Sequence, residues 1–186
     1  RIAQAPGIDL LQHGYAHTNH ALPPDKKTEL GPHRPAMIVL GELATGRMAL
    51  ERLFPQALPV LVPPWNRIAP GLVPALPEIG YRGLSTFGIR RRVHPVSGLL
   101  QVNTHIDLID WTARRFAGAD AVLAAFARAL ADSRASGEPI GVLSHHLAMD
   151  EPAWSFLQSL WEKVAGTPGM IIAAAHELFA SREARG

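Results

Sequence analysis

The sequence predicts an α/β fold in which parallel strands are joined by helices. Short apolar runs alternate with longer segments of helical period, which is the pattern of parallel strands with helical crossovers. The chain has 186 residues, of which 47% are hydrophobic and 18% are charged, so it is long enough and apolar enough to bury a real core. We therefore expect one globular domain spanning residues 1–186.

The expected strands are short apolar runs bounded by turn-forming residues. In chain order they are residues 9–12, 58–62, 83–86, 101–104, 140–144 and 170–173. The expected helices lie between or after these runs, at residues 34–54, 71–79, 119–131, 152–164 and 176–180.

Three of these helices carry further signals. Residues 34–54 place leucines at helical spacing, and Gly41 and Gly46 lower the helix propensity only locally. Residues 71–79 are interrupted by prolines, which predicts a short helix. Residues 152–164 carry Trp154, Leu157 and Trp161 on one face, which predicts a stripe that packs into the core.

Residues capable of chemistry follow the expected strands. His13 follows the first run, and residues 63–66 follow the second. His105 and Asp107 follow the fourth, and residues 145–146, both histidines, follow the fifth. Because the carboxyl ends of parallel strands meet at one face, we expect these side chains to gather there.

Three histidines lie within eight residues, at positions 13, 17 and 20. Imidazole is the commonest metal ligand, and a strand that ends in a helical turn can direct two histidines, four residues apart, at one ion. We expect His13 and His17 to bind a metal, with His20 as the alternative ligand and His105 as a further candidate. The competing interpretation is that these histidines only pack or lie in loops.

Composition excludes several classes of protein. The chain has no cysteine, so disulfides and thiolate metal sites are excluded. The formal net charge is only +2 and the arginine cluster at 90–92 has no aromatic interleaving, so no nucleic-acid partner is expected. No apolar run reaches the length of a membrane span and no signal peptide is visible, so we expect no membrane partner and a cytoplasmic setting.

These motifs resemble, in order and spacing, those of the metal-dependent polysaccharide deacetylases, a family of carbohydrate esterases. Residues 13–17 are similar to the family motif His-(Ser/Thr)-x-x-His, with Gly14 in place of the hydroxyl residue. Residues 62–65 approach Arg-x-Pro-Tyr without its arginine, which Arg67 is a candidate to replace. Residues 107–111 match Asp-x-x-Asp-Trp, and residues 143–145 match Leu-x-His.

One family motif has no counterpart in the sequence. The family's aspartate-rich first motif precedes the histidine pair and supplies a metal-binding carboxylate and the general base. Asp9 lies on the strand that leads into His13 and does not fill that place, and the chain begins at Arg1. The resemblance therefore implies an irregular (β/α) barrel that lacks its first strand, in an amino-terminally shortened domain with weak metal binding and low turnover.

The resemblance implies hydrolysis of an N-acetyl group on a carbohydrate, or of a related amide, with a divalent ion, most simply zinc, on His13 and His17. It implies that Trp65 donates its backbone N–H to the oxyanion. It also implies that Trp65 and Trp111 form walls of the substrate pocket. His145 is the expected general acid, with His146 as the alternative.

Two questions stay open at this point. Asp107 and Asp110 are expected to support the catalytic histidine, unless one of them only caps a turn. The alternative functions are a non-catalytic glycan-binding or scaffolding relative, and a hydrolase of another non-peptide C–N bond. The sequence does not fix an oligomeric state.

Overall fold

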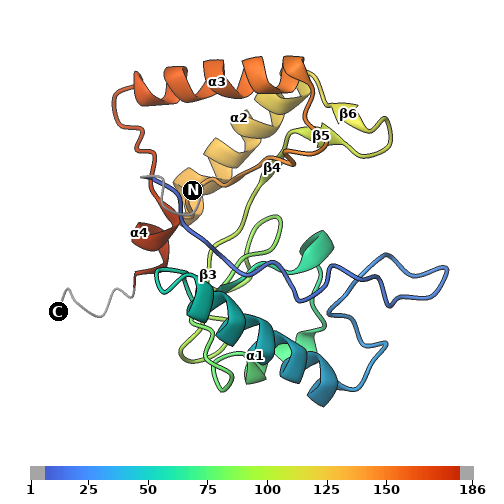
Figure 1. Cartoon of the computed structure of the whole chain (residues 1–186). Coiled ribbons are helices and arrows are strands. Elements are labelled where there is room, and N and C mark those ends of the chain that lie inside the picture. Colours follow the sequence, from blue (N-terminus) through green and yellow to red (C-terminus); the bar gives the residue numbers. More distant parts are fainter. Residues whose placement is uncertain (1–6, 181–186) are drawn as a thin grey trace. The chain divides into compact units, whose positions relative to one another are not determined.

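A computed structural model describes residues 7–180, and the chain divides into two compact units. The first unit contains the residues up to Val102 and those from Ala174 onward, and the second contains residues 103–173. In Figure 1, α1, β3 and α4 are labelled in the first unit, and α2, α3 and β4 to β6 in the second.

The first unit is built on a parallel sheet. Its strands β1 (Val60–Leu61), β2 (Gly83–Leu84) and β3 (Leu100–Gln101) are hydrogen-bonded in that order. Gln12 adds a parallel bridge beside β1, because its N–H donates to the Val60 carbonyl and its carbonyl accepts from the Val62 N–H. The first four expected strands thus form or join this sheet, and their parallel direction is confirmed.

Helices cover the core of the first unit. They are α1 (Ala36–Leu53), the 3₁₀ helices η2 (Pro64–Asn66) and η3 (Pro70–Ala75), and α4 (Ala175–Phe179). A Cβ atom at Gly46 would lie 2.6 Å from Nε2 of Gln12, so glycine is what lets α1 approach this strand. The long expected helix is therefore confirmed, and its second glycine has a packing role.

The second unit contains two long helices and two small sheets. Strand β4 (Ile106–Asp107) pairs in parallel with β7 (Val142–Leu143), and β5 (Ile109–Asp110) pairs antiparallel with β6 (Arg115–Phe116). Helices α2 (Ala119–Ser136) and α3 (Glu151–Ala165) confirm the two helices expected there. Buried residues of β4, the β4–β5 junction and α2 form its core, namely Ile106, Leu108, Val122 and Ala129.

Two expectations for this unit are wrong. The run 170–173 forms no strand: Ile171 is 88% exposed, and within residues 7–180 no strand pairs with the run. Trp154 and Trp161 are 44% and 45% exposed and do not belong to the buried core. The core-facing stripe of α3 is instead the neighbouring one, formed by Ala153, Phe156, Leu157 and Leu160.

Within the described stretch of the chain, no helix combines the length and the apolar character needed to cross a lipid bilayer.

Hydrogen bonds between Asp9 and His176 join the two ends of the first unit's described chain. The carboxylate of Asp9 accepts the backbone N–H of His176 at 2.8 Å and lies 3.0 Å from its Nδ1. Burial raises the pKa of Asp9, but the hydrogen bonds from the backbone and ring of His176 outweigh that effect and hold the pKa below its ordinary value of 3.8.

The depressed pKa of Asp9 makes the stability of the fold pH-dependent. Because the folded pKa of Asp9 is depressed, its contribution is present above the unfolded pKa and is lost as pH falls through the folded pKa. Asp9→Asn is expected to lower the free energy of unfolding at pH 7 by less than about 1 kcal/mol, since the pair is exposed. Urea unfolding is expected to find this difference shrinking below about pH 4. Glu78→Gln, at an exposed carboxylate of the same unit, is the control; a pH-independent difference for Asp9→Asn would contradict the assignment.

Candidate functional site

His13 lies on the surface directly after the strand pairing at Gln12. Its Nδ1 is 2.9 Å from the carbonyl oxygen of Val62. A carbonyl only accepts, so Nδ1 carries a proton, and in the neutral ring Nε2 is the nitrogen with the lone pair. Metal-binding histidines are oriented in this same way by a backbone carbonyl.

The ring of His17 lies close to the rings of His13 and Trp65, the other predicted site residues of the first unit. Its centroid lies 5.1 Å from that of His13 and 4.4 Å from that of Trp65. His17, Trp65 and Asn66 all have left-handed backbone conformations, with φ of 53°, 55° and 56°. Such conformations are uncommon outside glycine and cluster at binding and catalytic sites, which favours a functional interpretation of this group.

Position 14 is a glycine for a steric reason. Its φ is 66°, and a Cβ atom there would lie 2.2 Å from Oε2 of Glu29 and 2.5 Å from Cγ of Pro64. A serine or threonine, which the resemblance leads one to expect at this position, does not fit. The glycine at this position therefore follows from the positions of Glu29 and Pro64.

Glu29 is a residue of this site that sequence reasoning missed. It is buried, and its carboxylate accepts the backbone N–H groups of Tyr15, Ala16 and His17. No motif includes it, and its only signal in the sequence is that it is the first glutamate after the histidine cluster.

The second unit holds a separate group around Asp107. One carboxylate oxygen, Oδ2, lies 3.3 Å from Nε2 of His145 and accepts the indole N–H of Trp111 at 2.9 Å. The other, Oδ1, accepts the backbone N–H of Ile109 at 2.9 Å. The rings of Trp111 and His145 meet edge to face with centroids 4.6 Å apart. The β4–β7 register, which pairs Asp107 with Leu143, brings these residues together.

Asp110 has a different task. Its Oδ1 accepts the backbone N–H groups of Thr112 and Ala113, so it caps the turn between β5 and β6. Of the two aspartates in this motif, Asp107 is the one that contacts a histidine. His146, the alternative acid, is exposed beside His145.

The remaining candidates are held in other ways. Nδ1 of His105 accepts the N–H of Gly141 at 3.2 Å, and its Nε2 lies 3.5 Å from Oε1 of Glu138. Both ring nitrogens are thus directed at partners within the second unit. The backbone N–H of His20 donates to Thr28, and Arg67 donates to the carbonyl of Lys27 at 2.8 Å.

The histidine pair fits a divalent ion in two respects and falls short in a third. The spacing of the two rings suits a shared ligand position, and because Nδ1 of His13 faces the Val62 carbonyl, Nε2 is the nitrogen that would face an ion. Across residues 7–180, however, no group of three or more His, Cys, Asp or Glu side chains is arranged to hold a metal. The described residues thus offer two imidazoles here, and the other positions on an ion would be filled by water or substrate.

The candidate residues fall into two groups of different chemistry. His13, His17 and Trp65 belong to the first unit, and Asp107, Trp111 and His145 belong to the second. The first group offers ligand nitrogens and the second offers a carboxylate-oriented imidazole. Comparison of the chain with protein-family models, with curated proteins and with solved structures finds no match.

Proposed function

We propose that the chain is a metal-dependent hydrolase that removes N-acetyl groups from a carbohydrate or cleaves a related amide. The observation that carries the proposal is the exposed pair His13 and His17, whose ring centroids lie 5.1 Å apart and in which the Val62 carbonyl orients the His13 ring through Nδ1. The parallel strand pairs support an irregular (β/α) barrel of the polysaccharide deacetylase type as the fold that goes with this function.

In this proposal the first unit holds the ion and the oxyanion. His13 and His17 are the ligands, and zinc is the ion that two imidazoles and open positions suit best. When bound, such an ion supplies an activated water at neutral pH and polarises the amide carbonyl. Trp65, whose backbone is left-handed, is the proposed N–H donor to the developing oxyanion.

For the proton of the leaving amine, the proposal keeps the prediction from the sequence that His145 is the donor. Nε2 of His145 faces Asp107, so Nδ1 is the nitrogen that donates to the substrate. The carboxylate holds the ring in one orientation, which is the usual task of an aspartate behind a catalytic histidine. Trp111 is fixed by the same carboxylate and forms the apolar wall for the acetyl methyl.

The test is release of acetate from N-acetylglucosamine oligomers by the purified chain loaded with zinc. We expect release that stops when the ion is removed with EDTA and returns when zinc is restored. Release that is unchanged in metal-free protein contradicts the metal dependence. No release from the oligomers or from simple N-acetyl amides contradicts the reaction itself. A cytoplasmic setting stays part of the proposal as a prediction from the sequence.

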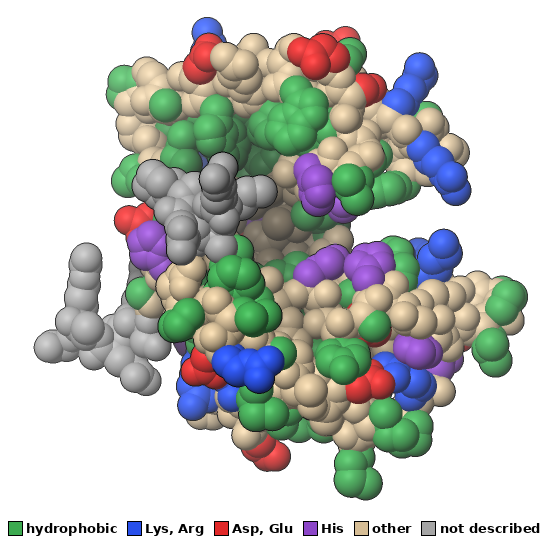
Figure 2. All heavy atoms as spheres, in the orientation of Figure 1, with side chains coloured by type: hydrophobic (Ala, Val, Ile, Leu, Met, Phe, Trp, Pro, Cys, Tyr) green, Lys and Arg blue, Asp and Glu red, His purple; other side chains and the backbone are tan. Residues whose placement is uncertain are grey.

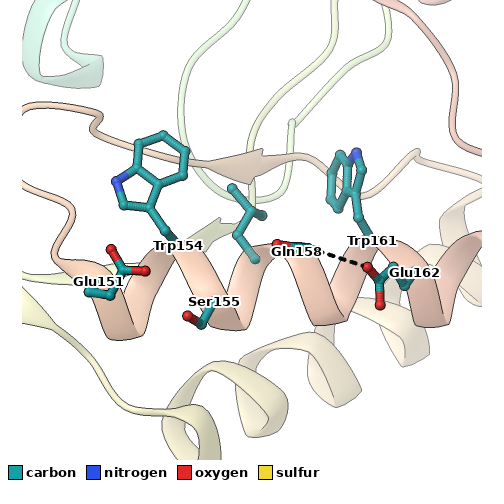
Figure 3. Close-up of a pocket in the computed structure, with 7 residues that line it drawn as sticks. Glu151, Trp154, Ser155, Gln158, Trp161 and Glu162 are labelled. Atoms are coloured by element: carbon teal, nitrogen blue, oxygen red, sulfur yellow. Dashed lines mark hydrogen bonds between the residues drawn. The ribbon is translucent and has the colours of Figure 1, made fainter.

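A second candidate function, glycan binding without catalysis, is favoured by the exposed face of α3. Trp154 and Trp161 project from one side of this helix, and α2 lies on the other (Figure 3). They line a pocket of about 480 Å³ with Ser155, Gln158 and other residues of α3. The two tryptophans are seven positions apart, a rise of about 10.5 Å along the helix axis, which gives a sugar chain two apolar surfaces beside polar groups. Figure 2 shows hydrophobic side chains gathered next to the position of α3.

Calorimetric titration with N-acetylglucosamine oligomers tests this second function. Trp154→Ala and Trp161→Ala are each expected to weaken binding at least tenfold if α3 is the glycan surface. Leu147→Ala, at a 93% exposed apolar side chain of the same unit, is the matched control. Equal affinity in all three variants excludes α3 as the binding surface.

A further inference from the structure

We propose that Glu29 is the positioning residue of the histidine pair: its buried carboxylate fixes the loop 13–17 in the shape that presents both imidazoles to one ion. The inference rests on the proposed function for the role of the histidines. The contact of Glu29 with the loop is a separate observation that can be tested on its own.

Three consecutive backbone amides of the loop point at this one carboxylate. Oε1 accepts from Tyr15 at 3.1 Å and from Ala16 at 2.7 Å, and Oε2 accepts from His17 at 3.2 Å. Successive N–H groups that converge in this way form a nest, which binds anions. The left-handed conformations of Gly14 and His17 bracket the nest, so Glu29 stabilises the backbone turn that separates the two histidines.

The other end of the loop is held by an amide. Nε2 of Gln12 donates to the carbonyl of Gly14 at 3.0 Å, and its Oε1 accepts the hydroxyl of Tyr81 at 2.6 Å. Gln12 is itself part of the strand pairing with β1. The loop is thus fixed between a sheet-bound amide and a buried carboxylate, although His13 and His17 themselves are exposed.

The geometry assigns Glu29 to positioning the loop and not to metal binding. Its side chain is only 1% exposed, and both its oxygens already accept N–H groups of the loop. An isolated buried charge is costly, and here three N–H groups compensate it. A neutral side chain of the same size cannot do so, because glutamine would turn an NH₂ donor toward one of these N–H donors.

The experiment compares zinc affinity with the order of the loop in Glu29→Gln. Titration with zinc alone is expected to give at least tenfold weaker binding than in the unchanged protein, as for other groups that orient metal ligands. Amide hydrogen exchange of Tyr15, Ala16 and His17, followed by NMR, is expected to become at least tenfold faster. Leu72→Ala, a core substitution in the same unit, is the stability control and is expected to keep both values within about twofold.

A second variant keeps the inference testable if Glu29→Gln does not fold. Glu29→Asp retains the charge but is one methylene too short to reach all three amides, so an intermediate loss of zinc affinity is expected. Unchanged affinity and unchanged exchange in the Glu29 variants overturn the inference, as does an equal loss of affinity in Leu72→Ala. If the unchanged protein does not bind zinc, the proposed function fails, and the exchange data still decide whether Glu29 holds the loop.

Discussion

Replacing Asp107 with asparagine is expected to lower the rate of deacetylation by about 10²–10⁴-fold while the protein stays folded. Oδ1 of Asp107 accepts the Ile109 N–H, so the amide oxygen of the asparagine keeps that place. The amide NH₂ then falls where Oδ2 now lies, facing the indole N–H of Trp111 and Nε2 of His145. The ring of His145, the proposed proton donor, and the indole of Trp111 beside it both lose their acceptor.

Asp110→Asn is the matched control for this substitution. Asp110 accepts two backbone N–H groups of its turn through one oxygen, and an asparagine side chain accepts them equally well. We expect kcat to change by less than about threefold. The measurement is kcat and KM at saturating zinc, with thermal unfolding to check the fold. Equal losses in the two variants would show that the motif supports the fold and not proton transfer.

Motif spacing alone did not distinguish these two aspartates. Both belong to one short motif ahead of a tryptophan, and each could cap a turn or support a histidine. The distinction arises from strand pairing, because β4 joins β7 near His145, whereas β5 turns back onto β6. Register between strands far apart in sequence is a tertiary property that local pattern does not encode.

Periodicity placed the helices but not always their buried faces. Two stripes on α3 have helical spacing, and they share Leu157. The first consists of residues 154, 157 and 161, and the second of residues 153, 156, 157 and 160. Residue size and hydrophobicity favour the tryptophans, yet the second stripe packs on the core. The apolar composition of the run 170–173 favoured a strand. A strand needs a neighbouring strand to hydrogen-bond with, and no strand within residues 7–180 pairs with this run.

Contacts between a side chain and the backbone were the least predictable part of the candidate site. The histidine spacing, the aromatic residue after the second strand and the motif at 107–111 are all legible in the sequence. Glu29 acts through the amides of Tyr15, Ala16 and His17, and every residue except proline has such an amide, so no residue pattern reveals it. Gly14 is an indirect sign of this contact in the sequence, because the carboxylate of Glu29 approaches so closely that only glycine fits there.

Replacing His17 with alanine is expected to weaken zinc binding by at least about 10²-fold, because one of two protein ligands is lost. Acetate release should fall in parallel, and His13→Ala should behave in the same way. The control is His20→Ala, which removes the competing ring, while the backbone N–H that donates to Thr28 is retained.

Zinc titration by calorimetry separates the two possible histidine pairs. His20→Ala is expected to keep its affinity within about twofold, since it is the ring of His17 that lies against both His13 and Trp65. A loss in His20→Ala together with normal binding in His13→Ala would move the site to His17 and His20. Normal binding in all three variants would mean that zinc binds elsewhere, and the hydrolase proposal would then lose the observation that carries it.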